Sequence, residues 1–139
     1  MEPGFKPMKG AEGWQLSNAP VFSMAVHRAA LDLFDRTSME QLNEKSQKLT
    51  GYFEFVVDEV SQKSEGQNFE IITPRDPAQR GCQISILAHG AGRELYDKLM
   101  AKGVVVDFRE PNVIRAAPVP MYNSFMDVYE FGKALNEAL

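Results

Sequence analysis

The spacing of apolar residues predicts two helices between about residues 20 and 60. Apolar positions recur at steps of three and four residues from Pro20, which suits the first turn of a helix, to about Arg36. Ser38, a residue type common at helix starts, opens a second and longer stretch with the same spacing. In that stretch Leu49 lies on the expected buried stripe, whereas Glu54 is expected to face water.

Gly51 interrupts the second helical stretch. A glycine inside a helix costs about 1 kcal/mol relative to alanine, so its presence needs a reason. Two explanations stay open: the glycine lets another element pack closely against the helix, or the helix tolerates a local bend there.

After residue 68 the apolar period shortens to two, which indicates strands. The predicted elements are strands at 69–73 and 82–88, a helix at 92–102, strands at 104–108 and 113–117, and a last helix after Ser124. Asp127, three residues after Ser124, completes a capping-box pattern. The order helix, helix, strand, strand, helix, strand, strand, helix predicts an α+β fold, with a small and mostly antiparallel sheet covered by helices on one side.

The first twenty residues differ from the rest in composition. Prolines and glycines are frequent there and predict an irregular arm over residues 1–20, in which Phe5 and Trp14 are apolar anchors that need a surface to pack on. We expect residues 21–139 to form one C-terminal domain, because a chain of 139 residues can build one core but not a two-domain enzyme.

Composition and charge argue against several classes of function. The chain is 44% hydrophobic and 24% charged, as is ordinary for a soluble domain. Its formal net charge of -4, without a cluster of lysines and arginines, argues against a nucleic-acid partner. No apolar run approaches the roughly 20 residues of a membrane-spanning helix. Because the chain has a single cysteine, Cys82, and no glycosylation acceptor, we expect a cytoplasmic protein.

The histidines and the cysteine give little support for metal or thiol chemistry. His27 and His89 lack a spacing that would combine with Cys82 or with paired carboxylates, so we expect no metal site. Cys82 opens an alternating strand, which favours a small core residue over a nucleophile.

Arg115 is the most informative candidate for ligand binding. It lies in the strand-like segment 113–117, where its small and apolar neighbours would let a guanidinium stand out. An arginine can bind a carboxylate through two parallel hydrogen bonds, which suits an amino-acid ligand. The alternative, a charged residue on the solvated face of a strand, is at least as common.

Asn18 and its neighbour Ser17 form a second candidate. The Asn18 amide can donate and accept hydrogen bonds in one place. Both residues also come just before the first predicted helix, and the pattern favours the structural interpretation, in which Ser17 or Asn18 caps that helix.

Three segments together resemble the kynureninase family. They are GWQLSNAP at residues 13–20, RGCQ at 80–83 and NVIRAAPVPMYNSF at 112–125. The resemblance runs from about Gly13 to the end of the chain and covers the family's carboxy-terminal small domain with the arm that leads into it. Kynureninases are homodimeric, fold-type I pyridoxal-phosphate enzymes that hydrolyse L-kynurenine or 3-hydroxykynurenine to an anthranilate and L-alanine.

The resemblance implies that Arg115 binds the α-carboxylate of the substrate, and that Ser17 and Asn18 lie near its aromatic ring. It also implies that the lysine that binds pyridoxal phosphate, with the large domain around it, precedes this segment, so that none of the eight lysines here is the cofactor lysine. We therefore expect no catalytic residue in this chain and no activity from it alone. Ala19 stands where the family often has proline, which should alter the rigidity of the arm more than its contacts.

A function of a different class is a stand-alone, non-catalytic α+β domain that binds a ligand or regulates a partner. Its support is that this order of elements is common and that a fold does not fix a function. A cofactor lysine encoded upstream in the same reading frame would favour the enzyme, and a genuine start at Met1 would favour the free domain.

Overall fold

The computed structural model describes residues 3–64 and 69–139, which form two compact units that divide between Ser38 and Met39. The first unit contains a 3-10 turn, η1 (Ala11–Trp14), and the helix α1 (Val21–Phe34). No residue of α1 is buried. The expected separation of an arm at 1–20 from a domain at 21–139 stays a prediction.

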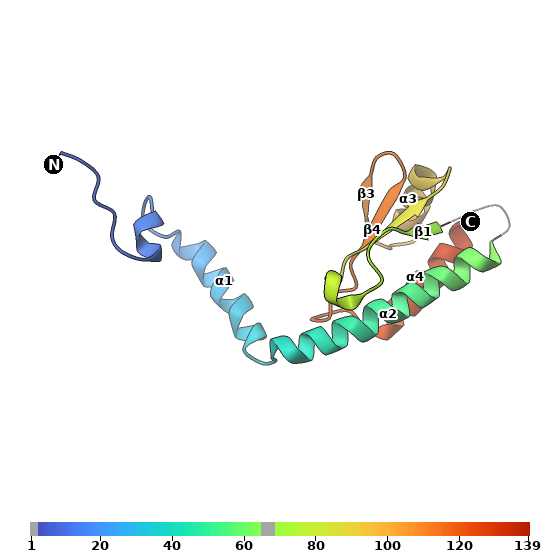
Figure 1. The fold of residues 1–139 in the computed structure, drawn as a ribbon, viewed down its shortest axis with the longest axis horizontal. Helices are drawn as coiled ribbons and strands as arrows, with labels where there is room; N and C mark the ends of the chain where they lie inside the picture. The colour runs from blue at the N-terminus through green and yellow to red at the C-terminus, as the bar shows by residue number, and fades with distance from the viewer. Residues whose placement is uncertain (1–2, 65–68) are drawn as a thin grey trace. The chain divides into compact units, whose positions relative to one another are not determined.

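The second unit contains the remaining elements in the predicted order (Figure 1). Its helices are α2 (Met39–Lys63), α3 (Gly92–Ala101) and α4 (Phe125–Ala138), and a 3-10 turn, η2, spans Pro77–Gln79. Its strands are β1 (Phe69–Ile71), β2 (Ile84–Ala88), β3 (Asp107–Arg109) and β4 (Val113–Ala116). The predicted α+β class and the predicted order of helices and strands are confirmed.

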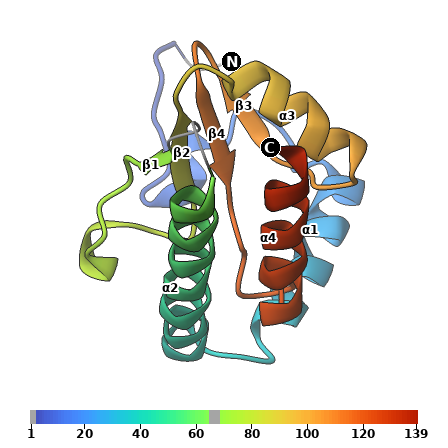
Figure 2. The ribbon, with the colours of Figure 1, turned by 90° about the vertical axis from the view of Figure 1, so that its right-hand side faces the viewer.

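The four strands form one antiparallel sheet in the order β1-β2-β4-β3. Ile84 lies opposite Ala116, and Ile86 opposite Ile114, and all four side chains are buried. Because successive residues of a strand point to opposite faces, these residues define one apolar face of the sheet. The helices pack on that face, with α2 and α4 side by side (Figure 2).

The core between the sheet and the helices contains aliphatic and aromatic side chains from every layer. Phe53 of α2 and Phe131 of α4 meet with ring centroids 4.7 Å apart, a separation typical of favourable aromatic pairs. Leu49, Leu99 and Leu135 are among the side chains that are almost completely buried. Burial of this apolar surface is the main term that stabilises the unit.

The strand predicted at 104–108 is shifted toward the C-terminus. Gly103 adopts a left-handed φ of 81°, and the Val104 N–H then donates to the Leu99 carbonyl to close α3. The backbone N–H of Val104 therefore bonds to the end of α3 and not to a neighbouring strand. The strand begins only at Asp107, where the chain pairs with β4. The β-branched run indicated a strand correctly but not its start.

The capping box predicted for the last helix is confirmed. The Ser124 hydroxyl accepts a hydrogen bond from the Asp127 N–H at 3.2 Å, and the Asp127 carboxylate accepts one from the Ser124 N–H at 2.7 Å. Two of the unpaired N–H groups at the start of α4 are thus satisfied.

Gly51 and Gly132 make a matched pair of helix glycines with different surroundings. A Cβ at Gly51 would meet nothing within 4 Å, so close packing does not explain this glycine. A Cβ at Gly132 would overlap the Cγ1 atom of Val56, which lies on the facing helix α2. Gly132 therefore permits the close approach of α2 and α4.

These surroundings predict opposite effects for the same substitution. Gly51→Ala should stabilise the domain by about 0.5–1 kcal/mol, through the higher helix propensity of alanine. Gly132→Ala should destabilise it by about 1–2 kcal/mol, because Val56 is stiff at χ1 and overpacking outweighs the propensity gain. Urea unfolding followed by circular dichroism would measure both, and a Gly132→Ala variant as stable as Gly51→Ala would contradict the assigned packing.

No helix among the described residues is long and apolar enough to cross a membrane.

Candidate functional site

The face of the sheet opposite the helices carries the polar residues of the strands. Ser85 and Arg115 alternate with buried core residues along β2 and β4, and Asp107 lies next to the half-buried Phe108 on β3. The register places Arg115 between Ser85 on one side and Asp107 on the other. Because residues directly opposite each other in an antiparallel pair point to the same side, these three side chains share the open face.

Arg115 is held at this face by Asp107. The Nε atom of Arg115 donates to Oδ2 of Asp107 at 2.7 Å, and Nη2 donates to the same oxygen. The hydrogen bond from Arg115, reinforced by the charges of Arg115 and Arg109, holds the pKa of Asp107 below its usual value. Asp107 is therefore a carboxylate at neutral pH, and the pair is ionic.

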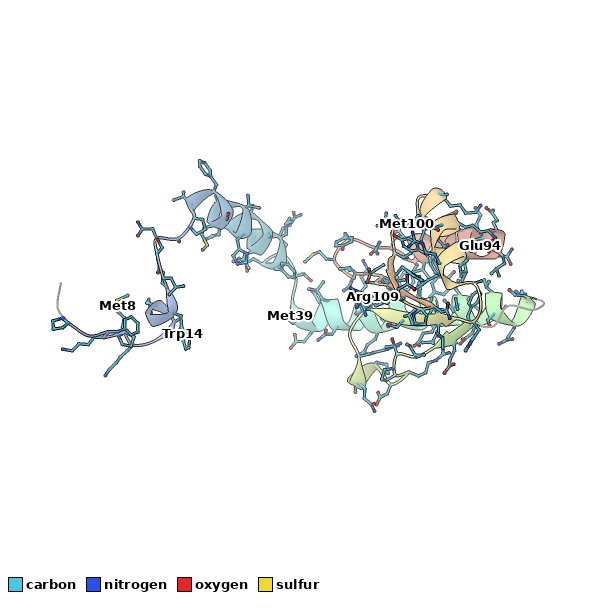
Figure 3. All side chains as sticks on the ribbon, turned by 90° about the horizontal axis from the view of Figure 1, so that it is seen from above. Met8, Trp14, Met39, Glu94, Met100 and Arg109 are labelled. Atoms are coloured by element: carbon cyan, nitrogen blue, oxygen red, sulfur yellow. The ribbon has the colours of Figure 1, made fainter. Side chains whose placement is uncertain are left out.

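A second guanidinium completes the cluster. The Nε atom of Arg109 donates to Oδ2 of Asp107 at 2.9 Å. Arg109 is exposed on the edge strand β3, where it is labelled in Figure 3. Two guanidiniums and one carboxylate leave a formal charge of +1, so the cluster can still attract an anion.

The geometry leaves part of Arg115 available to a ligand. Asp107 occupies the edge formed by Nε and Nη2, whereas Nη1 bonds to none of the residues that the structure describes. The side chain keeps 29% of its surface exposed. The edge formed by Nη1 and Nη2 can therefore donate two parallel hydrogen bonds to a carboxylate.

Ser17 and Asn18 lie in the first unit, between η1 and α1, and both are exposed. The interpretation that one of them caps the helix is wrong, because Pro20 occupies the N-cap position and no side chain caps the helix. The Ser17 carbonyl instead accepts a hydrogen bond from the Gln15 side chain at 2.7 Å. Their proposed contact with a substrate, and that of Arg115, stay predictions.

A buried ion pair lies where the sequence predicted a solvated helix face. Arg80 donates to both carboxylate oxygens of Glu54, and its Nη2 also lies 3.3 Å from the Thr50 hydroxyl. The two charged side chains are only 3% and 11% exposed. The expectation that Glu54 faces water is therefore wrong, because the segment between β1 and β2 folds back over this turn of α2.

The Arg80–Glu54 pair fixes the segment that leads into β2. Arg80 belongs to the RGCQ sequence, which continues directly into the strand that pairs with Arg115. Periodicity on α2 could not show this pair, since its partner is 26 residues away. The only signal in the sequence was that Arg80 falls within a segment that resembles a known family.

Histidine and cysteine form no metal centre in the described parts of the chain. His89 Nε2 lies 3.4 Å from the Glu70 carboxylate, and both side chains are exposed. No group of three or more histidine, cysteine or acidic side chains is placed to hold a metal ion within residues 3–64 and 69–139. Cys82 is a free, half-buried thiol.

The lysines of the second unit do not form a site for an aldehyde cofactor. Lys45 donates to the Pro120 carbonyl at 2.7 Å. The other five are paired with carboxylates, namely Lys48, Lys63, Lys98, Lys102 and Lys133. A lysine that forms a Schiff base needs a site in which its amine is desolvated or its charge disfavoured, and an ion pair favours the charged form instead. The lysines within residues 39–64 and 69–139 therefore do not by themselves provide a binding site for pyridoxal phosphate.

A groove of about 590 Å³ lies on the helix-covered side, between α4 and the segment that joins α3 to β3. Its lining includes Ala116 but not Arg115. The two lysines of the lining, Lys102 and Lys133, are already paired with acidic side chains. The groove is thus separate from the cluster on the open face and offers less to an anion.

Comparison with known proteins gives consistent matches. The family model of the kynureninase C-terminal domain matches residues 42–135. A kynureninase of Flavobacterium psychrophilum is 48% identical over all 139 residues, which make up 32% of that protein. Kynureninases of Myxococcus xanthus and Xanthomonas campestris pv. campestris are 49% and 50% identical over 97% and 94% of this chain, and over 31% and 30% of their own length. The chain thus spans about a third of the length of these relatives.

Proposed function

Because the chain belongs to the kynureninase C-terminal domain family, we propose that it is the carboxy-terminal part of a kynureninase. In this proposal the complete enzyme hydrolyses L-kynurenine or 3-hydroxykynurenine to an anthranilate and L-alanine. The observation that carries the proposal is the placement of Arg115 on the open face of the sheet, where no other residue in 3–64 or 69–139 occupies its Nη1–Nη2 edge and a carboxylate can bind.

The proposed role of Arg115 is to bind and orient the substrate through its α-carboxylate. Two parallel hydrogen bonds would fix both the position and the rotation of the amino-acid end, which a single point charge does not do. A substrate held in this way loses fewer degrees of freedom in the reaction itself. Ser17 and Asn18 are proposed to contact the aromatic ring, with the Asn18 amide able to bond a carbonyl or amino substituent.

The cofactor and the second subunit of the proposed enzyme involve residues outside this chain. Pyridoxal phosphate supplies an electron sink at the substrate's amino-acid carbon, and the lysines of residues 39–139 are engaged elsewhere. We propose that the preceding part of the polypeptide holds the cofactor and that the complete enzyme is a homodimer. The present residues then contribute the carboxylate anchor.

Kynurenine hydrolysis tests the proposal directly. The complete protein that carries this sequence should release anthranilate and alanine from L-kynurenine in the presence of pyridoxal phosphate. The purified 139-residue chain should show no hydrolysis above a control without enzyme, because in this proposal the cofactor lysine lies in the preceding part of the polypeptide. Anthranilate release by the chain alone, or no release by the complete protein with either kynurenine or 3-hydroxykynurenine, would contradict the proposal.

A further inference from the structure

Asp107 lies on the open face beside Arg115, and the proposed function gives it no role. Its side chain is 48% exposed, so burial does not explain the ion pair that it forms. An exposed ion pair contributes little to stability, typically less than about 1 kcal/mol. The geometry of the pair with Arg115 points instead to the binding site.

The contact is made through one particular edge of the guanidinium. Asp107 accepts from Nε and Nη2 of Arg115, which are the two donors on the side edge of the group. The end edge, formed by Nη1 and the second N–H of Nη2, has no partner in the described parts of the chain and keeps its donors. A carboxylate on the side edge fixes the plane of the guanidinium and turns the end edge toward a ligand.

The charges of the cluster are compatible with a second carboxylate at Arg115. Asp107 alone would neutralise Arg115 and weaken its attraction for an anionic ligand. Arg109 donates to the same Oδ2 atom and returns the formal charge of the cluster to +1. The register also places Asp107 directly opposite Arg115, so the contact requires no long and flexible reach between strands.

We propose that Asp107 is a positioning residue that holds the Arg115 guanidinium by its Nε–Nη2 edge and presents the Nη1–Nη2 edge to the substrate carboxylate. This inference rests on the proposed function, since it assumes that Arg115 binds that carboxylate. Asp107 itself contacts neither the substrate nor the reacting atoms. Without it, Arg115 samples several rotamers and loses part of its preorganisation.

The test is steady-state kinetics of the complete enzyme with Asp107→Asn. The KM for L-kynurenine should rise roughly tenfold, the scale of one hydrogen bond to a charged group, while kcat changes much less, because the loss affects binding of substrate and transition state alike. The inhibition constant of a carboxylate-bearing substrate analogue should rise in parallel. That of the corresponding amine without the carboxylate should stay unchanged.

Two further variants separate positioning from a structural role. Asp97→Asn is the matched control, because Asp97 of α3 also pairs with the Nε of an exposed arginine, Arg93, and should leave KM unchanged. Asp107→Asn placed in an Arg115→Ala background should add nothing to KM, since the group that it positions is gone. If Asp107→Asn does not fold, Asp107→Glu can replace it. This variant keeps the charge and moves the carboxylate by one methylene, so KM should rise by less than the roughly tenfold expected for Asp107→Asn.

The outcomes distinguish this inference from the proposed function. An unchanged or lowered KM in Asp107→Asn overturns the positioning role, and a lowered KM identifies Asp107 as a competitor of the substrate. An additive effect in the Arg115→Ala background also overturns it. If Arg115→Ala itself leaves KM unchanged in an active enzyme, the carboxylate role of Arg115 fails first. If the complete protein cleaves no kynurenine, the proposed function fails.

Discussion

Arg115→Ala in the complete enzyme is expected to lower kcat/KM for L-kynurenine by roughly several hundred-fold. The loss corresponds to about 3–4 kcal/mol of transition-state binding, as expected for two hydrogen bonds between charged groups. Steady-state kinetics with L-kynurenine would measure the effect.

Two comparisons make the Arg115 experiment specific. Arg115→Lys keeps the charge but not the paired donors, so its kcat/KM should fall between those of the parent and the alanine variant. A substrate-like amine without the α-carboxylate should inhibit the parent and Arg115→Ala equally. Unchanged kcat/KM in Arg115→Ala, or equal loss of affinity for both types of ligand, would remove Arg115 from the carboxylate site.

Glu54→Gln is expected to destabilise the domain by about 3–5 kcal/mol. The substitution leaves the Arg80 guanidinium almost completely buried without a counter-charge, which is the costly way to break a buried ion pair. The whole stability of a domain of this size is about 5–15 kcal/mol, so the loss is severe. Urea unfolding followed by circular dichroism, at neutral pH, would measure it.

The chain offers a matched control for the buried pair. Arg75 and Asp58 join the same two segments, one turn further along α2, through two hydrogen bonds of 2.8 and 2.9 Å. Their side chains are 51% and 41% exposed, so Asp58→Asn should cost less than about 1 kcal/mol. A similar cost for Asp58→Asn and Glu54→Gln would show that burial does not set the energy of the Arg80 pair.

The local pattern of apolar and polar residues was sufficient to predict the fold class and the order of helices and strands. Apolar periods of 3.6 and 2 predicted the α-helices and strands within residues 3–64 and 69–139, and their order. Ser124 and Asp127 lie three residues apart, and their mutual hydrogen bonds required nothing beyond the helix itself. The segment 113–117 was likewise expected to be a strand from which Arg115 could stand out, and in the structure Arg115 lies on the face of β4 opposite the core residues Ile114 and Ala116.

Strand ends and helix caps were less predictable, because neighbouring elements compete for the same residues. Val104 is β-branched, but the end of α3 uses its N–H before the sheet can. Ser17 and Asn18 have the right chemistry for caps, yet α1 starts after Pro20 without one. Propensity describes what a residue can do, and the adjoining chain decides which option is used.

The sequence by itself thus determined the α+β class and the order of the elements, because both depend on residues only a few positions apart. Only the tertiary structure decided that Glu54 is buried against Arg80, that Gly132 rather than Gly51 is the close-packing glycine, and that Asp107 holds one edge of Arg115. Those features depend on contacts between residues 8 to 76 positions apart in the sequence. The spacing of apolar residues within one helix or strand cannot predict such contacts.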